Sequence, residues 1–221
     1  MQRFTLIHDG SKQGWQTAYL AFHVAAQLGA PLLGLIVDAG SDMDALKKRA
    51  EQVEVGAHAA GVAIGTQLIP EFSVDAVDKY LGEGNGFFVP RRIIPDEETA
   101  RRFLDVMPCP LWLVSKGPGI NGMAVFVSVP GEQDALINYA STLSHRLKQT
   151  LTGLVLKGDL TQISQTEIDF SWLILSDSKR STISAALDRA NANLLVLSVS
   201  QFSLSMKTSF SCIFYPMNAN T

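Results

Sequence analysis

Side chains able to bind a ligand or move a proton follow two apolar runs in the first half of the chain. Asp9 directly follows the first apolar run, which ends on His8, and Arg91 and Arg92 follow the run 86–90. Ligands of open α/β sheets bind beyond the carboxyl ends of the strands. If both runs are parallel strands, these side chains meet at one edge of a sheet. Arg91 and Arg92 are then candidates for gripping an anion, and His8 for contacting a ligand or acting as an acid or base.

Each of these residues also has a purely structural interpretation. The acidic run Asp96, Glu97 and Glu98 could neutralise the two arginines in a solvated loop. A lone histidine at the end of a strand is commonly a structural residue. We expect the structural interpretation in both cases and keep ligand binding as the alternative.

Other catalytic and metal-binding patterns do not occur in the sequence. His23, His58 and His145 have no metal-ligand spacing among themselves or with carboxylates. Cys109 and Cys212 lack a C-x-x-C spacing and lie in apolar runs, so both are expected to be buried, inert thiols. The sequence also contains no P-loop, no strand-linked G-x-G-x-x-G and no G-x-S-x-G. We therefore assign no catalytic residue and no metal site.

The composition predicts a folded protein that binds neither nucleic acid nor membranes. Of the 221 residues 47% are hydrophobic, and the net charge of −3 argues against a nucleic-acid-binding face. No apolar stretch approaches the roughly 18–20 residues that cross a bilayer, and the first residues show no signal-peptide pattern, so we expect a cytoplasmic protein. Only 18% of the residues are charged, so a partner or a second domain is expected to cover some apolar surface.

Apolar periodicity predicts alternating strands and helices through the first half of the chain. Strand–helix–strand units of this length imply parallel pairing of the strands. Lys47, Arg49 and Glu54 are expected on the solvated face of one helix. The expected strands are 4–8, 32–37, 62–69, 86–90 and 109–114, and the expected helices are 16–28, 42–61, 74–81 and 96–106.

The second half repeats this order of elements. The sequence TGLVL at 152–156 echoes LGLIV at 33–37, 119 positions earlier, and both halves end on a cysteine-containing strand. We therefore predict two tandem domains, residues 1–116 and 120–221, joined by a linker at 116–119. The expected strands are 123–129, 152–156, 172–175, 194–197 and 210–214, and the expected helices are 132–147 and 182–190.

The second copy is expected to be abbreviated. Residues 157–170 leave no room for the helix that 42–61 supplies in the first copy. Residues 198–209 would hold one helical turn at best.

The order and spacing of three short motifs resemble the universal stress protein family. They are FTLIHDGS at 4–11, LGA-P-LLGLIVD at 28–38 and CPLWLVS at 109–115. The resemblance covers roughly residues 3–115 well and 121–216 more loosely. It implies two tandem open parallel-sheet α/β units of the adenine nucleotide α-hydrolase-like type, packed as a pseudo-dimer through their final strands, with a homodimer as a further option.

The resemblance also implies an adenosine pocket but not its phosphate loop. In nucleotide-binding members, the Asp at the end of the first strand and a backbone group near the end of the second hold adenosine; Asp9 and Val37 match these positions. Members then wrap the phosphates with G-x2-G-x9-G-[ST], whose glycines let backbone N–H groups approach. Here no glycine occurs from Phe87 to Lys116. In the second copy Pro130 takes the Asp position.

The sequence therefore predicts a universal stress protein-like binding or regulatory protein without family-type ATP binding. The alternative is an ATP- or AMP-binding stress protein with slow ATPase activity, in which Arg91 and Arg92 hold the phosphates. An ATP pyrophosphatase would need a Ser-Gly-Gly-x-Asp-Ser loop, which residues 8–12 match poorly. An electron-transfer-flavoprotein-like fold is disfavoured because no flavin-binding segment is evident.

Overall fold

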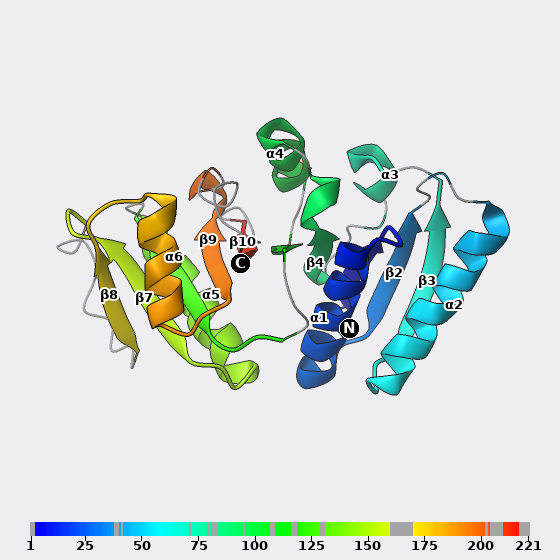
Figure 1. The fold of residues 1–221 in the computed structure, drawn as a ribbon, viewed down its shortest axis with the longest axis horizontal. Helices are drawn as coiled ribbons and strands as arrows, with labels where there is room; N and C mark the ends of the chain where they lie inside the picture. Colours follow the sequence, from blue (N-terminus) through cyan, green and yellow to red (C-terminus); the bar gives the residue numbers. More distant parts are fainter. Residues whose placement is uncertain are drawn as a thin grey trace. The chain divides into compact units, whose positions relative to one another are not determined.

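The computed structural model describes residues 3–37, 40, 42–70, 72–78, 80, 84–94, 96–106, 109–115, 119–128, 131–159, 170–201, 203 and 210–216. The chain divides into two compact units, residues 1–119 and 120–220. Each unit is an open parallel sheet with helices on its faces (Figure 1).

The first unit alternates strands and helices as the apolar pattern predicts. Its strands pair in the order β3-β2-β1-β4-β5, and every pair is parallel. The elements are β1 (Arg3–His8), α1 (Lys12–Leu28), β2 (Leu32–Val37), α2 (Met43–Ala59), β3 (Ile64–Ile69), α3 (Val74–Asp78), β4 (Gly84–Pro90), the 3-10 turn η1 (Arg91–Ile93), α4 (Glu97–Val106) and β5 (Leu111–Val114).

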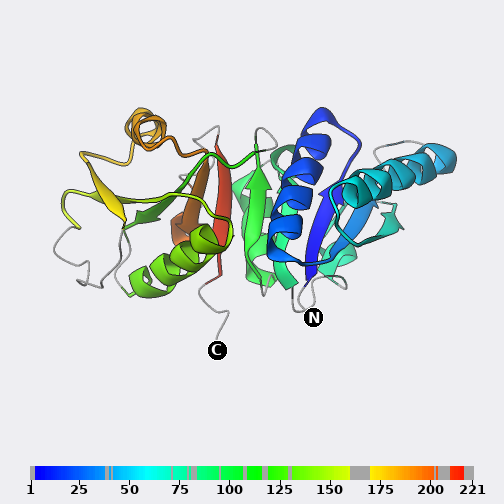
Figure 2. The same ribbon diagram turned by 90° about the horizontal axis from the view of Figure 1, so that it is seen from below.

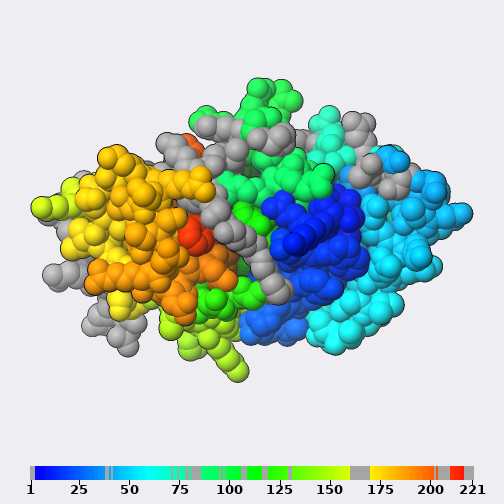
Figure 3. Space-filling view, viewed as in Figure 1, coloured from blue at the N-terminus to red at the C-terminus, as the bar shows by residue number. Residues whose placement is uncertain are grey.

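The strand order reverses between β1 and β4. The chain moves outward from β1 to β3 and then crosses back to β4 on the other side of β1. The helices α1 and α2 contact each other and cover one face of these strands (Figure 2), and their side chains form adjoining surface, blue and cyan, in Figure 3. Such a reversal opens a crevice at the carboxyl ends of the two central strands.

The second unit has the same topology. Its strands pair in parallel in the order β10-β9-β6-β7-β8, which is the first unit's order read from the other edge. Figure 2 shows α5 and α6 on opposite faces of these strands. The elements are β6 (Met123–Val127), α5 (Gln133–Arg146), β7 (Leu151–Leu156), β8 (Ser171–Leu175), α6 (Arg180–Arg189), β9 (Leu194–Ser198), the 3-10 turn η3 (Val199–Gln201) and β10 (Ser211–Tyr215).

Strand register relates the two units residue by residue. Phe4 pairs with Leu32 in the first unit as Met123 pairs with Leu151 in the second. The ends of α1 and α5 match too, because Ala30 N–H donates to Ala25 O and Gln149 N–H to Ser144 O. The offset of 119 seen in LGLIV and TGLVL therefore extends through the first strand, helix and second strand.

The register corrects two sequence-based expectations about the second copy. Val127 pairs with Val155 as His8 pairs with Ile36, so Ser128, not Pro130, takes the Asp9 position; Pro130 itself lies outside the described residues. The cysteines are not equivalent, because Cys212 lies inside β10 whereas Cys109 precedes β5. The cysteine-containing strands therefore give no support to the duplication.

The shortened crossovers of the second copy are only partly visible. The turn η3 lies within 198–209, but Ser203 is helical as well, so the expectation of a single helical turn at best is wrong. Residues 160–169, on which the expected loss of a helix depends, lie outside the described residues, as does the linker 116–118.

The residues that follow α1 and α5 predict how substitutions at these two positions change the free energy of unfolding. Gly29 and Lys148 take the same place after α1 and α5, with φ of 62° and 52°. A side chain at such φ costs about 1 kcal/mol relative to glycine. Lys148→Gly should therefore raise the free energy of unfolding by up to about 1 kcal/mol, as measured by urea denaturation.

The reciprocal variant serves as the control. Gly29→Lys should lower the free energy of unfolding by about 1 kcal/mol, and space is not the reason because nothing lies within 4 Å of a Cβ added at Gly29. Equal stability of Lys148→Gly and the unmodified protein would contradict this account.

Candidate functional site

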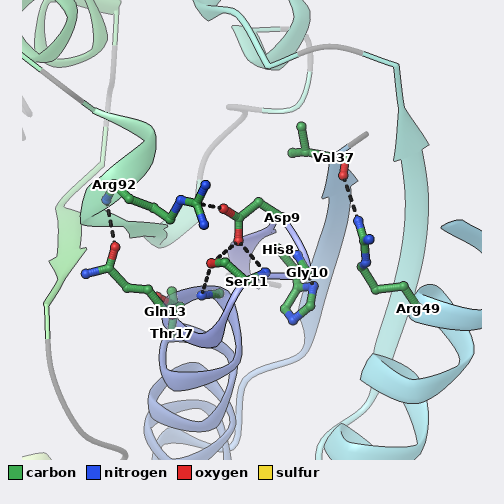
Figure 4. A network of polar contacts seen from close by, with 10 residues as sticks. His8, Asp9, Gly10, Ser11, Gln13, Thr17, Val37, Arg49 and Arg92 are labelled. Carbon is green, nitrogen blue, oxygen red and sulfur yellow. Dashed lines mark hydrogen bonds and ion pairs between the residues drawn. The ribbon is translucent and has the colours of Figure 1, made fainter. Parts of the chain in front are cut away.

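Asp9 is fixed in the tight turn that joins β1 to α1 (Figure 4). Its Oδ1 accepts hydrogen bonds from Ser11 N–H at 3.1 Å and Ser11 Oγ–H at 2.6 Å. Ser11 Oγ in turn accepts from Gly14 N–H at 2.9 Å and caps α1, as Ser, Thr, Asp and Asn do at helix starts. Gly10, at φ 76°, supplies the left-handed conformation of the turn.

Arg92 pairs with the other oxygen of Asp9. The Nε of Arg92 lies 3.3 Å from Asp9 Oδ2, with the Asp9 side chain 8% and the Arg92 side chain 61% exposed. Arg92 N–H also donates to Gln13 Oε1 at 2.7 Å, which ties the turn η1 to the start of α1. The partner of Arg92 is therefore Asp9 rather than the acidic run 96–98, where Glu98 pairs with Arg102.

Arg91 is directed toward the end of β5. Its Nη1 donates to Ser115 Oγ at 3.2 Å, and Gln13 Nε2 donates to Ser115 O at 3.4 Å. The structure thus brings Arg92, but not the Arg91 guanidinium, onto Asp9. Neither Gln13 nor Ser115 was singled out from the sequence, because neutral polar residues at these positions carry no motif.

The Val37 carbonyl accepts a hydrogen bond from Arg49, which was expected on the solvated face of a helix. Arg49 Nη1 donates to Val37 O at 3.1 Å, and a Cβ added at Gly10 would overlap the Arg49 guanidinium. Arg49 therefore lies over the Asp9 turn as well as on the end of β2 (Figure 4).

Two of the residues expected on the solvated face of α2 were misplaced. Arg49 is half-buried, and Glu54 accepts a hydrogen bond from Thr66 Oγ1 of β3 at 2.5 Å. Arg49 directly precedes Ala50, which is buried with Leu46 and Val53. Its position beside this buried stripe is the sequence signal that could have found it.

His8 is a buried, neutral residue at the same edge. Its Nδ1 accepts from Gly10 N–H at 3.3 Å, which leaves the proton on Nε2; within the described part of the chain no group bonds this atom. The ring lies edge-on to Trp15, with centroids 4.5 Å apart. Burial lowers the pKa of His8 to about 4, with Asp9 raising it and Arg49 lowering it further. These contacts favour the structural interpretation of His8.

The side of the site where phosphates would lie offers no glycine-rich backbone. From Phe87 to Lys116 there is no glycine, and Gly84 and Gly86 belong to β4 itself rather than preceding it. Pro90 at the end of β4 has no N–H to donate.

The equivalent edge of the second unit is closed by hydrogen bonds among Gln, Ser and Glu residues. Gln201 Nε2 donates to Ser128 Oγ at 2.8 Å, and Gln201 Oε1 accepts from Ser198 N–H at 3.0 Å. Ser200 Oγ donates to Glu132 Oε2 at 2.9 Å, and Glu132 has the register position of Gln13. The contact between the helix start and the 3-10 turn is thus kept, while the Asp–Arg pair is replaced.

Both cysteines are buried, and burial raises the pKa of the Cys109 thiol to about 11. Among the described residues no three His, Cys, Asp or Glu side chains could together hold a metal ion. None of the described helices is long and apolar enough to span a bilayer.

The strand order and the helices define an open parallel α/β unit, present twice in one chain. A scan against protein-family models found no match, and neither did a search of curated proteins. Among solved structures, the chain is similar to a universal stress protein from Archaeoglobus fulgidus, with a TM-score of 0.72, 13% identity and 98% of each chain covered. The chain therefore has the universal stress protein fold, as the sequence motifs predicted.

Two further solved structures share this fold over nearly their whole length. One is a putative universal stress protein from Pseudomonas aeruginosa, with a TM-score of 0.63, 12% identity and coverage of 97% of this chain and 93% of that one. The other is a functionally unknown protein from the same species, with a TM-score of 0.64, 12% identity and coverage of 99% and 94%.

The buried His8 predicts a pH dependence of stability. Its pKa is about 4 in the folded protein and 6.5 when exposed, so the unfolded chain binds more protons between these values. Stability should be unaffected by this group above pH 6.5 and should fall by about 3 kcal/mol as the pH drops to about 4. Urea denaturation of the protein and of His8→Gln across this range measures the difference.

His8→Gln removes the titrating group and keeps a polar side chain of similar length. The pH profile of this variant should be flatter by that amount, while carboxylates contribute equally to both profiles. Parallel profiles for the two proteins would show that His8 is not held neutral by the fold.

Proposed function

We propose that this protein is a non-catalytic regulatory protein of universal stress protein fold, whose first unit does not hold ATP in the manner of nucleotide-binding members. One observation carries the proposal. Asp9 and the Val37 carbonyl, the two groups that the resemblance assigns to adenosine, are each already bonded to an arginine of the same unit.

The contact of Arg49 with Val37 bears on base binding. A guanidinium that donates to the Val37 carbonyl takes the acceptor that an amino group of a base would use. Because the same guanidinium packs on Gly10, it also fills space above the Asp9 turn. A nucleoside therefore has to displace Arg49, and the free energy of that displacement is subtracted from its affinity.

The ion pair between Asp9 and Arg92 opposes binding of a ribose to Asp9 and of phosphates to Arg92. Both carboxylate oxygens of Asp9 are engaged, and if Arg92 turned to phosphate, the largely buried carboxylate would lose its charge partner. The Arg92 side chain is 61% exposed, so water screens this pair and breaking it costs about 1 kcal/mol or less. This weighs against the alternative in which Arg91 and Arg92 replace the missing glycine amides.

Among the described residues at this edge, we find none placed to catalyse hydrolysis. The imidazole of His8 is buried against Trp15, and with its pKa lowered to about 4 it is a weak base. The function we propose is therefore one of binding or regulation rather than catalysis.

Isothermal titration of the purified chain with ATP, ADP, AMP and adenosine tests the proposal. The unmodified protein should bind none of them tighter than about 1 mM. Arg49→Ala should bind adenosine and AMP at least about tenfold tighter, equivalent to about 1.4 kcal/mol. ATP should gain no more than AMP, because the phosphates find no donors.

Lys48→Ala is the matched control, since it removes an exposed cation from the same helical turn and should leave all four titrations unchanged. Micromolar binding of ATP by the unmodified protein, lost in Asp9→Ala, would contradict the proposal. Loss of that binding in Arg91→Ala or Arg92→Ala would instead support the alternative.

A further inference from the structure

The second unit contains a cavity at the edge of its sheet where β7 and β8 begin. Ser128 and Gln201, the counterparts of the candidate site, lie at the other edge, where the strands end. The volume of the cavity is about 770 Å³, within the range of small-molecule pockets. It lies where α5 and α6 end and where β7 and β8 begin, at the lower edge of this unit in Figure 1. Its polar lining includes Ser141, Ser144, His145, Thr152, Ser171 and Arg189.

Comparison with the first unit shows that this lining has changed chemically while the backbone has not. By strand and helix register, Ser141 takes the place of Phe22, and Ser144 and His145 take the places of Ala25 and Ala26. On the strands, Thr152 replaces Leu33, and Ser171 replaces Gly65. Every one of these positions is apolar in the first unit.

Two of these polar residues expose little of their surface, Ser144 at 6% and Thr152 at 8%. Ser144 Oγ donates to Ser141 O at 2.9 Å and keeps its lone pairs. No described residue is hydrogen-bonded to the Thr152 hydroxyl, and this oxygen is not among the buried polar atoms without a partner. The hydroxyl is therefore open to the cavity, where a ligand atom can bond it in place of water.

The charges of the cavity limit the kind of ligand. Arg189 and His145 line it, and none of the described lining residues is an Asp or Glu. A guanidinium can bind a carboxylate through two parallel hydrogen bonds. The carboxyl ends of α5 and α6 carry partial negative charge, which weakens the binding of every anion and disfavours a doubly charged phosphate more than a singly charged carboxylate.

We propose that this cavity binds a small polyhydroxylated carboxylate. Arg189 holds the carboxylate, with His145 beside it, and the Thr152 and Ser171 hydroxyls donate to hydroxyl oxygens of the ligand. Ser144 Oγ accepts from one of those hydroxyls. The site lies wholly in the second unit and is independent of the nucleotide groups around Asp9.

Isothermal titration of the full chain with gluconate, galacturonate and quinate tests this proposal. At least one of these acids should bind saturably, and Arg189→Ala should weaken it by about tenfold or more. Thr152→Val, which keeps the shape and removes the hydroxyl, should weaken it by about fivefold or more. Thermal unfolding of both variants without ligand shows that they remain folded.

Controls separate this site from general attraction of anions. Arg146→Ala removes an exposed cation at the end of α5 that does not line the cavity. This variant should leave binding unchanged. Glucose, which lacks the carboxylate, and acetate, which lacks the hydroxyls, should each bind at least about tenfold more weakly. Asp9→Ala and Arg49→Ala should have no effect, so failure here is distinct from failure of the proposed function.

Three results would overturn the proposal. They are absence of saturable binding for all three acids, equal binding by Arg189→Ala and the unmodified protein, and binding of inorganic phosphate or glucose as tight as that of the best acid.

Discussion

Parallel pairing of β1 with both β2 and β4 is the constraint on which the site depends. Because β1 lies between these strands, the residues that follow β1 and β4 meet at one edge although they are far apart in the sequence. The turn after β1 carries Asp9 and the turn after β4 carries Arg92, and their ion pair closes the crevice that the reversal of strand order opens. From the other side, α2 returns over β2 and brings Arg49 to Val37 O.

The same constraint has been met with different chemistry in the two units. The first closes its crevice with a largely buried carboxylate between Ser11 and Arg92; the second uses Gln201, Ser128 and Ser198. The register position of Asp9 thus carries a carboxylate in the first unit and the neutral hydroxyl of Ser128 in the second. Backbone register is the same in the two units, while the side chains at both sheet edges differ.

The fold could be predicted from the sequence because its signals are local. The run LLGLIV determines β2, which agrees with the expected strand 32–37. The expected helix 16–28 ends where α1 ends but starts too late, because α1 begins at Lys12, directly after its cap Ser11. The contacts of the site could not be predicted in this way. Arg49 looks like any cation of an amphipathic helix, and only the packing of α2 on β2 directs it to Val37 O. The position of Pro130 was wrong because loop residues carry no register of their own, and pairing of β6 with β7 assigns the Asp9 place to Ser128.

The central claim is that the chain's own arginines occupy the groups that would hold adenosine. A crystal structure of the full chain grown in millimolar ATP measures this directly. We predict electron density for the Arg49 guanidinium on the Val37 carbonyl, for Arg92 on Asp9, and none for a base at the end of β2. An adenine ring bonded to Val37, with Arg49 turned away and Asp9 on the ribose, would contradict the account.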